Sequence, residues 1–269
     1  MKKIIAMMLA LMLALTGIAI FTACDTDKTP EETTPEATTP EETEPEAPAV
    51  IKMATNAYFQ PYEFYEDGKI VGIDAEIAAA IAEKLGMTLE IVDMEFDSII
   101  TAVNEGSVDF GMAGMTVTED RLKEVDFSIS YANGVQTIIV KEDSPITSVD
   151  DLFAEGAAYK VGVQLGTTGD IYATGDFGSE NVTTYSNGNE AVLALLGGSV
   201  DCVIIDNEPA KALVAANEGL KTLETAYANE DYAICVKKGN SELLAKIDQA
   251  IKDLTADGTI DAIVAKYIK

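Results

Sequence analysis

A tetrapeptide that occurs twice, each time between a helical segment and an apolar run, limits the folds open to this chain of 269 residues. Gly-Ser-Val-Asp stands at 106–109, after FDSIITAVNE, and again at 198–201, after NEAVLALLG. Gly114 and Asp206 each follow the aspartate of their tetrapeptide by five residues. The matching flanks predict two related α/β units with Gly114 and Asp206 at equivalent strand ends, where open parallel sheets usually bind ligands.

From Val50 onward, short β-type runs alternate with helical patterns, which predicts an α/β fold with largely parallel sheets. In the helix expected at 74–85, Ile77, Ile81 and Leu85 line one face. Two more helices are expected near the end of the chain, at 241–254 and 259–267. The expected strands include 51–55, 88–93, 159–164, 200–206 and 232–237.

Composition narrows the function classes. The chain has no histidine, so it lacks the usual general base of serine and cysteine hydrolases and the commonest zinc ligand. Its formal charge of -28 argues against a nucleic-acid partner, whose phosphates need clustered Lys or Arg. Cys202 and Cys235 lie in apolar segments as small buried hydrophobes would, although their spacing leaves a disulfide open.

The N-terminus has the pattern of a secretory signal, with a basic start and an apolar run over residues 4–20. Small residues directly before Cys24 resemble a bacterial lipobox, so we expect a lipoprotein signal peptide over 1–24 and lipidation, including palmitate, at Cys24. The alternative is an uncleaved membrane anchor, since a run of about 17 residues is near the short limit for a span. Residues 25–49 repeat a Thr-Pro-Glu theme and are expected to form a disordered acidic tether of roughly 70 Å.

Arg121 is the sole arginine among 18 basic residues. A guanidinium is a rigid planar fork that matches a carboxylate, which a lysine does not offer. Gly114 and Thr116 lie nearby in sequence, and the residues 118–120 read as a helix start. A surface arginine in a helical first turn is the alternative interpretation.

A second anion-binding pattern follows at 164–170 (QLGTTGD), between a strand and a helical segment. Its glycines allow a ligand to approach the backbone, and free N–H groups at a helix start favour an anion. Asp206 adds a carboxylate for an ammonium group, with Thr116 and the Gly114 carbonyl as further acceptors. These groups together predict two complementary subsites for a zwitterion.

The region from Val50 to Lys269 resembles the extracellular solute-binding proteins of family 3, which deliver polar amino acids to ABC-type permeases. The resemblance runs through ATNAYFQPYEF, VGIDAEIAAAIAEKLG, MTVTEDRLKEVDFSISY and VGVQLGTTGD. It implies a two-lobed periplasmic-binding-protein-like fold of type II with two crossings between the lobes. Lobe 1 would comprise 50–133 and 231–269, and lobe 2 would comprise 134–230.

By that resemblance, Arg121 and Thr168 match residues that bind the ligand α-carboxylate, while Gly114, Thr116 and Asp206 match those that bind the α-ammonium. Phe59 and Phe96 match positions beside the ligand side chain, although both could be ordinary core residues. Asn56 stands where several relatives that bind cationic or amide side chains carry an aspartate. The candidate ligand-binding residues are Asn56, Phe59, Phe96, Gly114, Thr116, Arg121, Gln164, Thr168 and Asp206.

Three functions compete. The first is a lipid-anchored extracytoplasmic binding protein that captures a polar L-amino acid for ABC transporter permease subunits. The second is a dehydratase on the same fold, which needs a positioned general acid; no matched role is evident for Glu63, Glu95 or Asp97. The third is a ligand-sensing receptor subunit. We expect the first, as a monomer without catalytic residues, cofactor, metal site or nucleic-acid partner.

Overall fold

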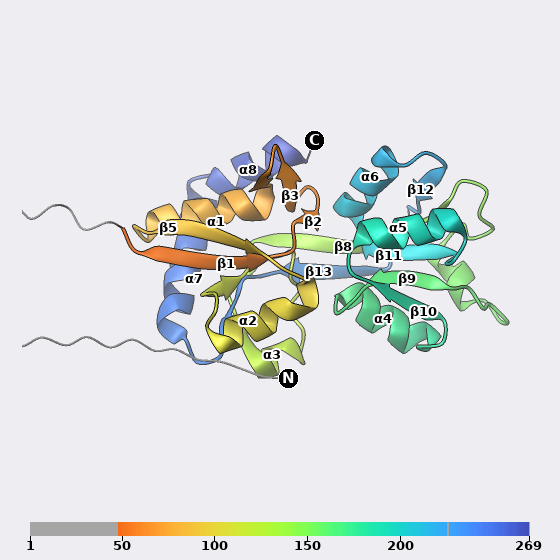
Figure 1. Cartoon of the computed structure of the whole chain (residues 1–269), viewed down its shortest axis with the longest axis horizontal. Coiled ribbons are helices and arrows are strands. Elements are labelled where there is room, and N and C mark those ends of the chain that lie inside the picture. The colour runs from red at the N-terminus through yellow and green to blue at the C-terminus, as the bar shows by residue number, and fades with distance from the viewer. Residues whose placement is uncertain (1–47, 225, 269) are drawn as a thin grey trace, which may run out of the picture. The chain divides into compact units, whose positions relative to one another are not determined.

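The computed structural model describes residues 48–224 and 226–268, and Figure 1 shows how their helices and strands are arranged. The expected signal peptide at 1–24, with Cys24, and nearly all of the expected tether at 25–49 lie outside these residues. Within the described ranges, no helix is long and apolar enough to cross a membrane.

The first large sheet contains β1 (Val50–Thr55), β5 (Thr88–Asp93), β6 (Phe110–Gly111), β7 (Val125–Phe127) and β14 (Cys235–Lys237). Their order across the sheet is β5-β1-β6-β14-β7. β1 pairs in parallel with β5 and β6, whereas β14 is antiparallel to β6 and β7. A small sheet precedes the first helix and contains β2 (Tyr58–Phe59), β3 (Glu63–Glu66) and β4 (Lys69–Val71).

The helices of this lobe follow from their apolar spacing. Ile77 and Ile81 are fully buried on one face of the first helix, as expected, and the following Gly86 has a positive φ. The expected helix over 96–105 is divided into a 3-10 turn and a short α-helix. The helices are α1 (Ile73–Lys84), η1 (Phe96–Ser98), α2 (Ile99–Glu105), α3 (Arg121–Glu124), α7 (Ser241–Ala256) and α8 (Thr259–Tyr267).

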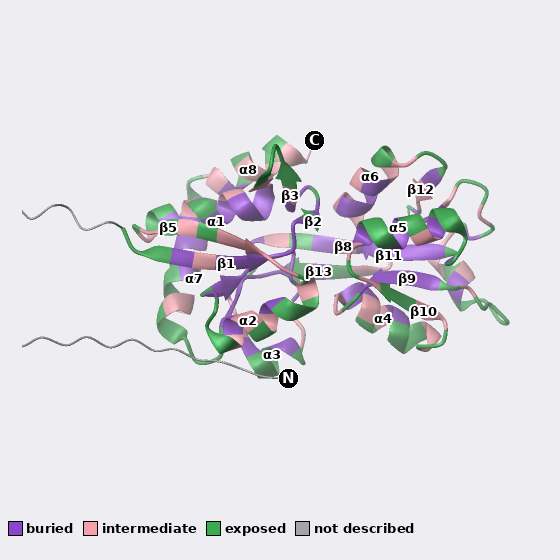
Figure 2. Ribbon diagram, viewed as in Figure 1, coloured by how far each residue is buried: buried purple, intermediate pink, exposed green. Residues whose placement is uncertain are grey.

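The second large sheet contains β8 (Ala132–Lys141), β9 (Val161–Gln164), β10 (Val182–Tyr185), β11 (Cys202–Asp206), β12 (Leu220–Thr222) and β13 (Ala228–Tyr232). The order is β10-β9-β11-β8-β12, with β13 also paired to β8. β9 and β11 are buried throughout, as Figure 2 shows. The helices of this lobe are η2 (Val149–Phe153), α4 (Thr168–Phe177), α5 (Gly188–Gly197) and α6 (Asn207–Ala216).

The sheets are less parallel than the sequence predicts. Parallel pairing holds for β1 with β5 and β6 and for β9 with β10 and β11, but β8 is antiparallel to each of its neighbours. Parallel strands need a long crossover connection, usually a helix. β8 follows β7, and β14 follows β13, without an intervening helix, so these strands enter their sheets in the opposite direction.

Two strands carry the chain between the lobes. β8 and β13 run antiparallel, with Gly134 opposite Glu230. Just outside this pair, the Tyr131 N–H donates to the Tyr232 carbonyl over 3.0 Å. A Cβ atom on Gly134 would lie 2.4 Å from the ring of Tyr232, so only glycine fits beneath this ring. The expected pair of crossings is therefore a hydrogen-bonded ribbon near 132–134 and 229–231 (Figure 1).

The repeated tetrapeptide builds the same turn in both lobes. Gly106 and Gly198 end α2 and α5 with nearly identical left-handed angles, φ 77° and ψ 22° or 19°. Three residues on, the Asp109 carboxylate accepts the Lys52 N–H over 2.7 Å, and the Asp201 carboxylate accepts the Lys160 N–H over 2.7 Å. Through these hydrogen bonds, each aspartate connects the turn before its own strand, β6 or β11, to β1 in the first sheet or to the residue before β9 in the second.

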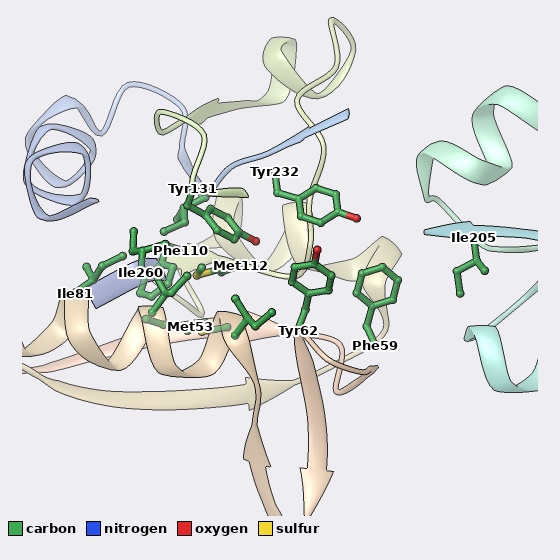
Figure 3. Packing of buried hydrophobic residues seen from close by; sticks show 14 of the residues in the cluster. Met53, Phe59, Tyr62, Ile81, Phe110, Met112, Tyr131, Ile205, Tyr232 and Ile260 are labelled. Atoms are coloured by element: carbon green, nitrogen blue, oxygen red, sulfur yellow. The ribbon is translucent and has the colours of Figure 1, made fainter. Parts of the chain in front are cut away.

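Buried apolar residues form a core on each side of both sheets. One large cluster includes residues of both lobes, among them Phe59, Tyr62 and Tyr232 from one and Ile205 from the other. Figure 3 shows these three rings grouped together, with Ile205 on a strand of the second sheet. The Tyr62 and Tyr232 rings meet edge to face, with centroids 5.2 Å apart.

Candidate functional site

A pocket lies between residues of the two lobes and contains all the ligand-binding candidates in its wall. Asn56, Phe59, Phe96, Gly114, Thr116, Arg121, Gln164, Thr168 and Asp206 all line it. The wall also contains Glu63, Ala113, Gln136, Thr167, Ile204 and Ile205. The structure thus brings the candidates together, while their contacts with a ligand stay predictions.

Arg121 is held rigidly in the cavity wall, with only 7% of its surface exposed. Its Nη1 donates to the Thr116 carbonyl over 2.7 Å, and its Nη2 donates to the Gly166 carbonyl of the other lobe over 2.9 Å. Its guanidinium carbon lies 5.3 Å from the centroid of the Phe96 ring. A guanidinium has five N–H donors, so about three remain for an anion. The alternative interpretation of Arg121 as a surface arginine is therefore wrong.

The first turn of α4 lies on the same side of the cavity. Thr167 caps this helix, and its Oγ1 accepts the Asp170 N–H over 3.3 Å. Thr168 is the first helical residue and is buried in the cavity wall. The first N–H groups of a helix have no partner within the helix and favour an anion. Because Gly166 contacts Arg121, the helix start and the guanidinium form one positive region.

The opposite chemistry surrounds Asp206, the last residue of β11. Its Oδ2 accepts from Gln136 Nε2 over 2.8 Å, and its Oδ1 accepts from the Tyr232 hydroxyl. Burial, followed by the negative charge of Glu230, raises the pKa of Asp206 to about 7. Among the described residues that line the cavity, Arg121 is the only basic one. A buried carboxylate of this kind is stabilised by a cationic ligand group.

Gly114 forms part of the wall through an unusual backbone conformation. Its φ is +53°, and a Cβ atom there would lie 2.7 Å from Cε1 of Phe59. Its N–H donates to Asp74 Oδ2 over 2.8 Å, as does the Tyr131 hydroxyl. The Asp74 carboxylate therefore links the cavity wall to the residue that precedes β8.

Glu63 and Asp74 form a buried carboxyl pair. Burial, the charge of Asp74 and a hydrogen bond to it raise the pKa of Glu63 well above its usual value, and burial raises that of Asp74 to about 6. Both Glu63 oxygens and Asp74 Oδ1 have no other hydrogen-bond partner among the described residues. A proton on Glu63 that is donated to Asp74 would pair one oxygen of each carboxyl group, and the raised pKa of Glu63 favours this arrangement.

The remaining wall is polar and aromatic. Asn56 Nδ2 donates to the Met94 carbonyl over 2.8 Å, and Asn56 Oδ1 accepts from Gln164 Nε2 over 2.9 Å. The second of these bonds joins the two lobes. Phe59 packs against Tyr62 with ring centroids 5.7 Å apart, so it also belongs to the core.

Cys202 and Cys235 do not pair. Both are free thiols, one in β11 and the other in β14. Burial raises the pKa of each to about 12, which makes both unreactive near neutral pH. In the described part of the chain, no group of three or more His, Cys, Asp or Glu residues could hold a metal ion.

Sequence reasoning missed Gln136 and Glu230, and it gave Glu63 no role. Gln136 interrupts the apolar run VQTIIV, a signal that could have marked it. Glu63 and Glu230 stand among other acidic residues, and nothing local distinguishes them. Their importance comes from contacts between residues far apart in the sequence.

Residues 51–269 match the sequence pattern of the bacterial extracellular solute-binding proteins, family 3. The chain belongs to this family. Family 3 proteins are extracellular, which agrees with the expected place outside the cytoplasm.

Individual members of family 3 agree in length and fold. The arginine-binding extracellular protein ArtP of Bacillus subtilis is 32% identical over 222 residues, covering 80% of this chain and 84% of ArtP. The solved structure of an ancestral arginine-binding protein bound to glutamine is 41% identical, with a TM-score of 0.77 over 82% of this chain and 98% of that one. An ancestral amino acid-binding protein described as a precursor of cyclohexadienyl dehydratase is 33% identical, with a TM-score of 0.74 over 82% and 96%.

Proposed function

We propose that this protein is the substrate-binding component of an ABC importer and that it captures a polar L-amino acid between its lobes. The observation that carries the proposal is the placement of the Arg121 guanidinium and the Asp206 carboxylate in the wall of one cavity. The first would bind the α-carboxylate together with the start of α4. The second would bind the α-ammonium together with Gly114 and Thr116.

Both lobes contribute to each subsite, so ligand binding and closure of the lobes are coupled. Arg121, Thr116 and Gly114 come from lobe 1, taken as 50–133 and 231–269, and Thr168 and Asp206 come from lobe 2, taken as 134–230. The β8–β13 ribbon is the only described connection between the sheets and is suited to hinge motion. Equal radii of gyration with and without saturating ligand in solution scattering would refute this coupling.

The side-chain end of the cavity favours a polar, uncharged or basic ligand side chain. Asn56 and Gln164 offer amide groups there, and Phe59 and Phe96 offer aromatic rings. Ring faces favour planar amides and cations. Arginine-binding and glutamine-bound relatives belong to this range.

A thermal unfolding scan against the common amino acids tests the proposal. A ligand at about a thousand times its dissociation constant adds roughly 4 kcal/mol to the free energy of unfolding. For a folded body of this size that is a rise of about 8–16 °C in Tm. No rise with any amino acid, or a rise with glutamate or aspartate alone, would overturn the proposed ligand class.

We also propose that the protein does no chemistry on its ligand. Burial raises the pKa of the cavity carboxyl Glu63 well above its usual value, but a proton on Glu63 would be shared with Asp74 and not aimed at a ligand. Incubation with prephenate-like acids tests this directly. Product formation that is lost in a Glu63→Gln variant would establish a dehydratase instead.

Attachment to the membrane is part of the same proposal. The lipobox-like sequence before Cys24 and the acidic tether would hold a monomeric binding protein near its permease. Labelling cells with a palmitate analogue and comparing the wild type with Cys24→Ala tests this. Label that persists in the variant, or a wild-type chain without label, would exclude lipidation at Cys24.

A further inference from the structure

Behind the Asp206 carboxylate lies a second buried acid, Glu230, on the β13 strand that joins the lobes. Glu230 is 7% exposed, yet it does not line the cavity. Its Oε2 accepts from Gln136 Nε2 over 3.0 Å, and Gln136 Nε2 also donates to Asp206 Oδ2 over 2.8 Å. A single amide nitrogen therefore bridges the two carboxylates.

The bridge fixes the orientation of Gln136. Its Nε2 faces the two acidic residues and, at 3.5 Å, Thr168 Oγ1, so its Oε1 must face another direction. Gln136 is 1% exposed and lines the cavity, and its Oε1 has no hydrogen-bond partner among the described residues. Glu230 Oε1 has no partner within hydrogen-bond distance in the described part of the chain, although the Glu230 carboxylate as a whole also interacts with the Tyr172 hydroxyl. Buried acceptors without donors are rare and costly, and of these two oxygens only Gln136 Oε1 belongs to a residue of the cavity wall, where a ligand could supply a donor.

Most of the titratable side chains around Asp206 are acidic or neutral. Arg121, the one cation among the facing residues, is already bonded to two main-chain carbonyls. Burial lowers the pKa of the Arg121 guanidinium, and the negative charges of Glu230 and Asp206 offset only part of that shift. The titratable and charged groups that face Asp206 are Tyr62, Glu63, Arg121, Tyr172, Glu230 and Tyr232.

We propose that Glu230 is a positioning residue of the ammonium subsite: through Gln136 it orients Asp206, and its charge strengthens the preference of the subsite for a cationic group. This inference rests on the proposed function, because it concerns how the α-ammonium is held. Glu230 acts without touching the ligand. It makes the corner more negative and raises the pKa of Asp206.

The consequence is a specific pH dependence of affinity. Burial and the charge of Glu230 raise the pKa of Asp206 to about 7, so ammonium binding should strengthen as the pH rises from about 5.5 to about 8 and Asp206 loses its proton. Replacing Glu230 by glutamine removes its charge, while the amide oxygen still accepts from Gln136. The pKa of Asp206 then falls, and the rise in affinity moves to lower pH.

The test compares dissociation constants of the wild type, Glu230→Gln and Asp231→Asn for the best amino acid and for its deaminated analogue, at about pH 5.5 and about pH 8. Asp231→Asn is the matched control, because it removes one charge from the next residue of β13, which is exposed. We expect Glu230→Gln to bind the amino acid on the order of tenfold more weakly near pH 8 and to show a smaller ratio between the two pH values. The analogue and the control should change within about twofold.

A second variant keeps the test independent of Glu230→Gln. Gln136→Met removes the bridge but leaves both carboxylates, and it should also weaken amino acid binding. The double variant should lose less than the product of the two single losses, because both act through one contact. An unchanged pH ratio in Glu230→Gln, or fully multiplicative losses, would overturn the inference while leaving the proposed function standing. A wild type that binds no amino acid would overturn both.

Discussion

Replacing Arg121 by lysine keeps the charge but removes the fork. Arg121 joins Thr116 of one lobe to Gly166 of the other through Nη1 and Nη2, at 2.7 and 2.9 Å, and its remaining N–H groups are those that would bind the proposed carboxylate. A lysine ammonium is a single point that cannot occupy both positions. We therefore expect the loss of at least one charge-assisted hydrogen bond in the bound state, about 1.5–3 kcal/mol, or roughly 10- to 150-fold in affinity.

Isothermal titration with the best amino acid from the thermal scan measures this change. Lys123→Arg is the matched control, because Lys123 is exposed on the same short helix and pairs only locally with Asp120. The control should bind within about twofold of the wild type. If Arg121→Lys also binds within twofold, Arg121 does not hold the carboxylate, and the reasoning from its geometry is wrong.

Three further predictions concern the cavity wall. Gly114→Ala should lower the affinity for the amino acid on the order of tenfold or more. The φ of +53° is strained for alanine, and the added Cβ would lie 2.7 Å from Phe59. A folded variant that binds with wild-type affinity in a titration would contradict this. In the wild type, the raised pKa of Glu63 stabilises the fold at low pH, and this contribution is lost as the pH rises through the folded-state value. Glu63→Gln should therefore flatten the decline of Tm between about pH 5 and about pH 8, and an unchanged slope in thermal unfolding would show that Glu63 is not the proton donor to Asp74. Asn56→Asp should shift selectivity from glutamine toward lysine or arginine, because it adds a negative charge to the pocket. It should also lower the free energy of unfolding, because the hydrogen bond from Asn56 Nδ2 to a main-chain carbonyl is lost. Competition titrations without such a shift would show that Asn56 does not line the side-chain pocket.

The parts of the site that could be predicted are those with a local signature. Arg121 stood out as the sole guanidinium, and Asp206 as the residue that follows the second copy of a repeat. Gly114 followed the first copy in the same way. In each case the residue type and the neighbouring pattern were enough, because strand ends in an α/β fold meet at one edge.

Other parts depend on contacts that no local pattern reports. Gln136 meets Asp206 and Glu230 across sequence separations of 70 and 94 residues. The sequence predicted largely parallel sheets and did not reveal the antiparallel β8, because alternation of apolar runs does not distinguish a helical crossover from a direct passage between lobes. The raised pKa of Glu63 depends on its complete burial beside Asp74, which the sequence YEFYE does not reveal.

The two equivalent turns at 106–109 and 198–201 bring different chemistry to the cavity wall. Each turn ends a helix, fixes an aspartate on the adjacent strand and delivers the chain to the cavity five residues later. At that point one half presents the bare backbone of Gly114, and the other presents the carboxylate of Asp206. The two units thus share the same turn, and they differ at the residue five positions later, which defines the shape of the cavity wall in one unit and its charge in the other.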